Sequence, residues 1–185
     1  MKLKRVVVGI DPATTNTEDS DETGIVACGL GADGHGYVLD DFTLRASPDG
    51  WARKAWALFD KHQADRVVVE VNQGGEMVRH TLETVRKNGP ITTVHAKKAK
   101  RLRAEPIAAL YEQGRVHHVG MFRALEDQMT TWDPDDENRD DSPDRIDALV
   151  YALTELMLDS VDVDGIGFGS VVQESPWNFG NVVRR

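Results

Sequence analysis

The stretch that decides the fold is Ser142-Pro143-Asp144-Arg145-Ile146-Asp147-Ala148-Leu149-Val150-Tyr151-Ala152-Leu153. Four of its apolar residues recur with the i, i+3, i+4, i+7 spacing of an amphipathic helix: Ile146, Leu149, Val150 and Leu153. Pro143 suits a first helical turn, where its missing N–H costs nothing, and Ser142 suits the N-cap. The pattern predicts a helix over residues 143–159 with one buried face.

Two acids, Asp144 and Asp147, lie three residues apart at the start of this predicted helix. At that spacing both side chains leave the first turn on the same side. Acids at a helix N-terminus also interact favourably with the helix dipole, so stabilisation of the helix start is one explanation. The other explanation is a functional site, and it depends on acids elsewhere in the chain.

Two further acids are associated with apolar, strand-like runs. Asp11 directly follows the run over residues 5–10, and Glu70 lies inside the run over residues 65–71. An unpaired charge is costly to bury, so such an acid needs a basic partner, a proton or a metal ion. A strand-end turn for Asp11 and an outward-pointing Glu70 are the alternatives.

The four acids, Asp11, Glu70, Asp144 and Asp147, converge if the two strands are neighbours and the helix starts beside them. A cluster of hard oxygen ligands favours Mg²⁺ or Mn²⁺. Two such ions about 3.5–4 Å apart would stabilise the attacking and leaving oxygens of a phosphodiester. Without metal, repulsion between the carboxylates would leave the site strained or partly protonated.

The composition indicates one soluble domain. The chain has 185 residues, of which 40% are hydrophobic and 29% charged. No apolar run approaches the roughly 20 residues of a membrane span, and the N-terminus lacks a signal-peptide core. The single Cys28 excludes an internal disulfide and a cysteine-rich zinc site. We therefore expect an intracellular, reducing compartment and no membrane partner.

The net charge of -9 is unevenly distributed. Residues 133–147 hold eight acids, whereas residues 79–103 hold eight basic residues against Glu83 alone. Basic side chains from this segment could contact the phosphates of nucleic acid: Arg79, Lys97, Lys98, Lys100, Arg101 and Arg103. A solvated helix face is the alternative. Since no base-reading motif is present, we expect little sequence preference.

The order of predicted elements favours an α/β fold with a mixed sheet covered by helices. Strands are expected over residues 5–10, 23–30, 37–44, 65–71, 91–95 and 115–119. Helices are expected over residues 47–63, 76–87, 97–113, 121–132 and 143–159, with Pro106 kinking or splitting the third. Residues 133–141 are expected to form a mobile loop, and residues 160–185 a hairpin or partly disordered tail after a domain over residues 1–159.

The acids and several motifs together bear a family resemblance. The first acid stands in Gly-Ile-Asp (9–11), and the longer motifs are Val-Glu-Val-Asn-Gln-Gly-Gly-Glu-Met-Val (69–78), Lys-Arg-Leu-Arg-Ala-Glu-Pro (100–106), Tyr-Glu-Gln-Gly-Arg-Val (111–116) and Ser-Pro-Asp-Arg-Ile-Asp-Ala-Leu (142–149). From about residue 4 to about residue 158, the chain resembles the C-terminal nuclease domain of tailed-phage terminase large subunits, in the ribonuclease-H-like superfamily.

The resemblance implies a ribonuclease-H-like mixed central sheet flanked by helices and an endonuclease that cuts concatemeric double-stranded DNA with two metal ions, Mg²⁺ or Mn²⁺. Asp11 and Glu70 match the first two metal-binding acids of the family. The third falls on Asp144, which we favour because it is nearer the helix start, or on Asp147. The implied partners are duplex DNA, the packaging ATPase domain, the small terminase subunit and the portal protein, in the cytoplasm of an infected bacterium. The chain has no Gly-x-x-x-x-Gly-Lys-Ser/Thr loop, so ATP-driven translocation is not expected of it.

Three other functions compete with this one. A Holliday-junction resolvase shares the acid pattern. An actin-like or sugar-kinase-like ATPase is suggested by residues 9–16, but the chain is short for the two lobes of that class. A docking domain of the packaging motor would leave the acids without metal. His95, His117 and His118 could be ligands or bases, but we expect them to be strand-surface or edge histidines.

Overall fold

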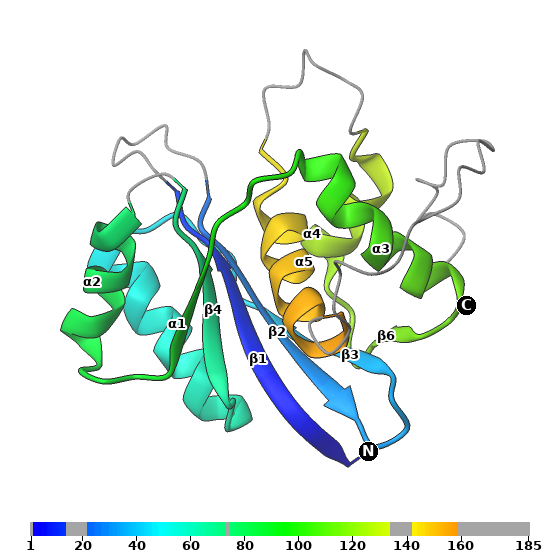
Figure 1. Cartoon of the computed structure of the whole chain (residues 1–185), viewed down its shortest axis with the longest axis horizontal. Helices are drawn as coiled ribbons and strands as arrows, with labels where there is room; N and C mark the ends of the chain where they lie inside the picture. The colour runs from blue at the N-terminus through cyan, green and yellow to red at the C-terminus, as the bar shows by residue number, and fades with distance from the viewer. Residues whose placement is uncertain (1, 14–21, 73–74, 134–141, 159–185) are drawn as a thin grey trace.

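The computed structural model describes residues 2–13, 22–72, 75–133 and 142–158 (Figure 1). A six-stranded sheet with the order β5-β4-β1-β2-β3-β6 forms its centre. The strands are β1 (Leu3–Asp11), β2 (Gly24–Gly31), β3 (Gly36–Asp41), β4 (Arg66–Glu70), β5 (Ile91–Val94) and β6 (Val116–His118). The first three form an antiparallel meander, and β4, β5 and β6 add in parallel to β1, β4 and β3. The predicted mixed sheet is confirmed.

Helices cover both faces of the sheet (Figure 1). They are α1 (Pro48–His62), α2 (Gly75–Val85), α3 (Lys100–Glu112), α4 (Arg123–Thr131) and α5 (Asp144–Met157). The first two pack on one face and the last three on the other, with α5 lying directly across β1 and β2. No helix in the described ranges is long and apolar enough to span a membrane.

The two faces of β1 contribute side chains to two separate hydrophobic cores. Val7 packs with α3, α4 and α5, whereas Val6, Val8 and Ile10 pack with α1 and α2. This alternation follows from the two-residue period of a strand, and it explains why the run reads as continuously apolar. Cys28 of β2 lies fully buried in the α5-side core, where burial raises the pKa of its thiol.

Glycines allow α5 to lie unusually close to the sheet. A Cβ added at Gly9 would lie 2.1 Å from the carbonyl oxygen of Ala148, and one at Gly24 would lie 2.0 Å from that of Asp144. Both contacts are with backbone, which cannot move aside like a flexible side chain. Gly9 of β1 and Gly24 of β2 thus set how closely the first turns of α5 approach the sheet.

Several predicted boundaries were wrong for local reasons. Residues 97–99 precede α3, because the Lys97 amide donates to the His95 carbonyl in a turn. Pro106 does not split α3: it lies exposed on a helix that Ile107, Ala108 and Tyr111 bury from the other side. β3 ends at Asp41, and Leu44 makes only an isolated bridge with Thr23. The predicted loop over residues 133–141, apart from residue 133, and the predicted tail fall outside the described residues.

Candidate active site

The four predicted acids line one pocket of about 330 Å³ at the ends of β1 and β4 and the start of α5. Parallel pairing of Ile10 with Val69 brings Asp11 and Glu70, the last residues of their strands, side by side. The full lining is Asp11, Pro12, Ala13, Glu70, Asn72, Ala96, Lys98, Ala99, Lys100, Arg103, Ser142, Asp144, Asp147 and Tyr151. The predicted convergence of the acids is confirmed.

Glu70 points toward the α5 side of the sheet. Val68, two residues earlier in β4, packs on this side, and side chains two apart in a strand share a face. It is 7% exposed, and its Oε1 accepts a hydrogen bond of 2.7 Å from the Asn72 amide. Burial raises the pKa of Glu70, although this hydrogen bond and the Arg103 charge oppose the shift. Asn72 is itself fixed by donating its side-chain amide to the Ala96 carbonyl at 2.7 Å.

Two cations of α3 reach into the acid cluster. The Lys100 ammonium lies 2.7 Å from Asp147 Oδ2, and an Arg103 guanidinium nitrogen lies 3.3 Å from Asp147 Oδ1. The Lys100 contact lacks hydrogen-bonding geometry, so among the described residues no hydrogen bond reaches this buried Oδ2. Arg103 also donates to the hydroxyl of Tyr151 and lies over its ring. The Asp147 charge is therefore balanced from within the protein.

Asp11 experiences the combined charge of the cluster. Burial raises its pKa well above the ordinary value, and the charges of Asp147, Asp144 and Glu70 raise it further, while Lys100 opposes them. Burial, followed by the Asp11 charge, likewise raises the pKa of Tyr151. Burial thus favours the protonated forms of Asp11 and Glu70 unless positive charge is supplied to the site.

The residues fit a hard divalent cation in chemistry but are not preassembled around one. All four acids offer carboxylate oxygens, the donors that Mg²⁺ and Mn²⁺ prefer, and the buried Asp147 Oδ2 lacks a hydrogen bond. Across the described part of the chain, however, no three histidine, cysteine or carboxylate side chains are arranged to hold a metal ion as they stand. The pocket thus offers the right donor chemistry without a ready-made coordination geometry.

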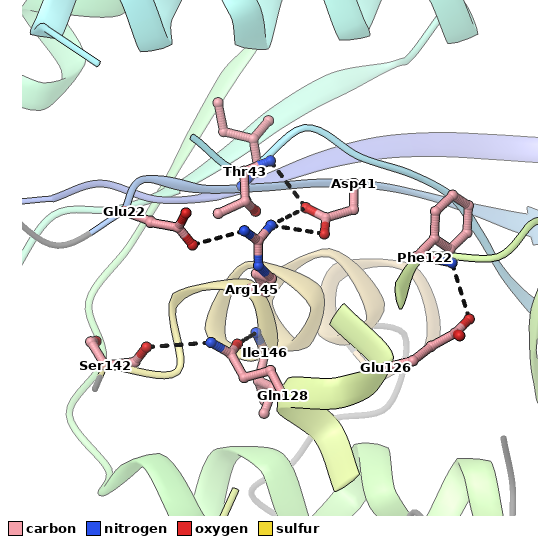
Figure 2. A network of polar contacts seen from close by, with 10 residues as sticks. Glu22, Asp41, Thr43, Phe122, Glu126, Gln128, Ser142, Arg145 and Ile146 are labelled. Atoms are coloured by element: carbon pink, nitrogen blue, oxygen red, sulfur yellow. Dashed lines mark hydrogen bonds and ion pairs between the residues drawn. The ribbon is translucent and has the colours of Figure 1, made fainter. Parts of the chain in front are cut away.

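The start of α5 differs from the sequence prediction. Pro143, not Ser142, occupies the N-cap position, and it provides no side-chain cap. Ser142 Oγ instead accepts from Lys100 Nζ at 3.2 Å. The capping hydrogen bond comes from another helix: Gln128 Oε1 of α4 accepts the amide of Ile146 at 3.1 Å (Figure 2).

The structure separates the six predicted DNA-binding cations into groups. Lys98, Lys100 and Arg103 line the acid pocket. Arg79 lines a second pocket of about 590 Å³ and pairs with Glu83 at 2.8 Å. Arg101 lies 3.8 Å from Glu105, and Lys97 is exposed beside the pocket wall. Whether they bind DNA remains a prediction.

The histidines differ from one another. His95 and His117 are exposed, as predicted for surface residues. His118 is mostly buried between Tyr111 and Glu126, with contacts of 2.8 and 3.0 Å, and it lies on the edge strand β6, so it is an edge histidine as the prediction allowed. The edge strand β6 is covered by α3 and α4 at this point, which the local pattern could not reveal.

Comparison with known proteins identifies a family. A family profile described as the terminase RNaseH-like domain matches residues 8–156. No curated protein sequence gives a significant match.

Three solved structures share the fold at low sequence identity. The large terminase nuclease from thermophilic phage G20c, solved with bound zinc, is 15% identical with a TM-score of 0.65 and covers 82% of this chain and 81% of that one. The nuclease domain of the large terminase subunit gp2 of bacterial virus Sf6, in a mutant form with manganese, is 13% identical with a TM-score of 0.56 over 83% and 89%. Thermus thermophilus RuvC is 17% identical with a TM-score of 0.51 over 84% and 95%. The predicted ribonuclease-H-like fold is confirmed.

Proposed function

Because the chain belongs to the terminase RNaseH-like domain family, we propose that it is the endonuclease domain of a phage DNA-packaging terminase, cutting concatemeric double-stranded DNA. The observation that carries the proposal is the pocket in which Asp11, Glu70, Asp144 and Asp147 meet basic residues of α3. Cutting would take place in the cytoplasm of an infected bacterium, where the packaging ATPase domain, the small terminase subunit and the portal protein would be its partners.

Divalent metal ions, Mg²⁺ or Mn²⁺ and two in number, complete the proposed site. Asp11, Glu70 and Asp144 would hold them, with Asp147 beside them. When bound, such ions polarise the scissile phosphate and lower the pKa of a nucleophilic water. Two relatives support a divalent-metal site, since the G20c nuclease was solved with zinc and the Sf6 domain with manganese.

The remaining site residues have roles that follow from their contacts. Asn72 holds Glu70 at the end of β4 by donating its backbone amide. Lys100 and Arg103 neutralise Asp147 in the free protein, and both also face the pocket where a DNA phosphate would lie. Lys98 adds a cation at the pocket wall. These contacts address phosphate, so cleavage should depend little on base sequence.

A nicking assay on supercoiled plasmid tests the proposal. The full chain is incubated with Mg²⁺, Mn²⁺, Ca²⁺ or EDTA, beside Asp11→Ala, Glu70→Ala and Asp144→Ala. Each variant should lose at least about 100-fold in activity, the scale expected when a group that stabilises transition-state charge is removed, and should keep its circular dichroism spectrum. Asp60→Ala, which removes an exposed acid paired with Arg86, is the matched control and should cut normally. Undiminished cutting by all three variants would refute the acid site.

A Holliday-junction resolvase is the second candidate, because Thermus thermophilus RuvC shares the fold. Competition between a four-way junction and a linear duplex of equal length distinguishes the two. Equal cutting of both supports the terminase nuclease, whereas strong preference for the junction favours the resolvase. Absence of cutting with any metal would favour a docking domain of the packaging motor.

A further inference from the structure

The first turn of α5, which carries Asp144 and Asp147, is fixed by a side chain outside the acid pocket. Gln128 of α4 accepts the Ile146 amide at 3.1 Å and donates to the Ser142 carbonyl at 3.4 Å (Figure 2). These two contacts lie on either side of Asp144 in the sequence. Gln128 therefore fixes the backbone that presents Asp144 to the pocket.

A second contact fixes the same turn against the sheet. Arg145 stands between the two acids in the sequence, and Figure 2 shows its guanidinium directed toward Glu22 and Asp41; its side chain is only 14% exposed. Its Nη1 lies 3.2 and 3.0 Å from the two carboxylate oxygens of Asp41, and its Nη2 lies 2.8 Å from Glu22. The Asp41 side chain is 6% exposed, and its carboxylate also accepts the Thr43 amide at 3.0 Å. A guanidinium held by two acids in this way has little freedom to shift.

The partners of Arg145 lie next to the strand ends that carry Asp11. Glu22 immediately precedes Thr23, whose hydroxyl accepts the Ala13 amide at 3.2 Å. The following residue, Gly24, is the register partner of Asp11. A movement of α5 that broke the Arg145 contacts would therefore change the separation between Asp11 and the two acids of α5.

We propose that Arg145 and Gln128 are positioning residues that set the carboxylate spacing on which divalent-metal binding depends. This inference rests on the proposed function, because it assumes that the acid pocket takes a metal ion. Neither residue lines the acid pocket, so neither would touch a metal ion held there. Both act through the backbone of α5.

Replacing Arg145 would have opposite effects on metal binding if the residue acts through its charge and if it acts by positioning α5, so the inference can be tested. If Arg145 acted only through its charge, replacing it with a neutral residue would remove a cation near the site and strengthen metal binding. If it acts by positioning, the same replacement weakens metal binding. Gln128 is uncharged, so any change in metal binding on its replacement reflects the position of the α5 start and not a change of charge.

Calorimetric titration of the full chain with Mn²⁺ provides the test. Arg145→Met and Gln128→Ala should each weaken Mn²⁺ binding about 10- to 100-fold, as replacements behind metal ligands do. Arg145→Lys should fall between wild type and Arg145→Met, because it keeps the charge but lacks the two separate nitrogens that contact Asp41 and Glu22. Arg5→Met is the matched control and should leave Mn²⁺ binding unchanged. It removes an arginine that pairs with Glu155 at 2.9 Å, near the opposite end of the same helix.

The plasmid assay adds a second readout: the variants should lose kcat while keeping KM for DNA, because they leave the pocket-lining cations Lys98, Lys100 and Arg103 unchanged. Unchanged or tighter Mn²⁺ binding in Arg145→Met, or wild-type binding in Gln128→Ala, would overturn the inference. If Arg145→Met does not fold, Arg145→Lys and Gln128→Ala decide the result. Failure of the wild-type chain to bind Mn²⁺ would refute the proposed metal site itself, which is a different outcome.

Discussion

At the scale of single residues, Asp11 determines how the site responds to pH. Burial and the neighbouring acids raise its pKa. Folding therefore favours the protonated acid, and this contribution to stability is present at low pH and lost as the pH rises through the raised pKa. At neutral pH, where the unfolded chain ionises this acid, Asp11 therefore destabilises the metal-free protein.

Asp11→Asn should therefore stabilise the protein in EDTA at neutral pH. Each unit of pKa shift corresponds to about 1.4 kcal/mol, and a domain of this size gains about 2–4 °C in Tm per kcal/mol. Thermal melts from pH 4 to pH 8 should show a higher Tm and a weaker fall with pH than wild type. Asp49→Asn is the control: its carboxyl is exposed and hydrogen-bonded to Arg53, which lowers its pKa, so Tm should not rise. A lower Tm for Asp11→Asn in EDTA would contradict this account.

The residue scale also shows what the sequence could and could not predict about the site. The acids could be found because Asp11 and Glu70 follow or interrupt apolar runs, an exception that stands out locally. The ion pair of Arg145 with Asp41 could not, because its partners are 104 residues apart and each looks like an ordinary surface charge. The role of Gln128 was missed for the same reason, since Ser142 offered a local cap that the fold does not use.

At the scale of elements, the contact of α5 with β1 and β2 depends on glycine. Gly24→Ala would place a methyl group 2.0 Å from the Asp144 carbonyl oxygen, so the helix start must move outward. We expect a loss of about 1–3 kcal/mol or more, measured by urea unfolding, together with weaker Mn²⁺ binding. Gly120→Ala is the control, since its nearest atom is on the Phe122 ring at 3.3 Å. Wild-type stability of Gly24→Ala would show that α5 is not held at this depth.

Pro106 should destabilise helix α3. The proline is exposed in the helix interior, where it supplies no amide for the carbonyl one turn earlier. Pro106→Ala should therefore stabilise the protein by about 1–3 kcal/mol, seen as a higher urea midpoint with the same m-value. Glu105→Ala, the neighbouring control, should change stability by less than about 0.5 kcal/mol. A lower midpoint for Pro106→Ala would mean that the proline has a role in folding or packing.

The element scale explains which sequence predictions were accurate. Strands and helices were located correctly where apolar period and turn residues agreed, as in α1, where the Ser47 hydroxyl accepts the Gly50 amide as a cap. The error at residues 97–99 arose from a local turn, in which the Lys97 amide donates to the His95 carbonyl. The error at Pro106 arose because burial of Ile107, Ala108 and Tyr111 holds α3 together across the proline.

At the scale of the whole molecule, an acidic protein is proposed to bind a polyanion through one local surface. Lys98→Ala should weaken duplex binding and reduce the slope of log K against log salt concentration by about 0.9, the value for one lost phosphate contact. Fluorescence anisotropy over a range of salt concentrations measures both quantities. Lys4→Ala, near the far end of β1 from Asp11, is the control and should leave the slope unchanged. Equal slopes for wild type and Lys98→Ala would exclude this lysine from the DNA surface.

The single cysteine allows the opening of the central sheet to be measured by chemical labelling. Cys28 is fully buried in β2 with layers of helices on both sides, so a thiol reagent reaches it only when the sheet opens. The labelling rate under native conditions therefore counts opening events in the unmodified protein. If opening releases the metal, Mn²⁺ at 100 times its dissociation constant should slow labelling about 100-fold. The labelling rate of Cys28, on the strand next to β1, would then report whether a metal ion occupies the acid pocket.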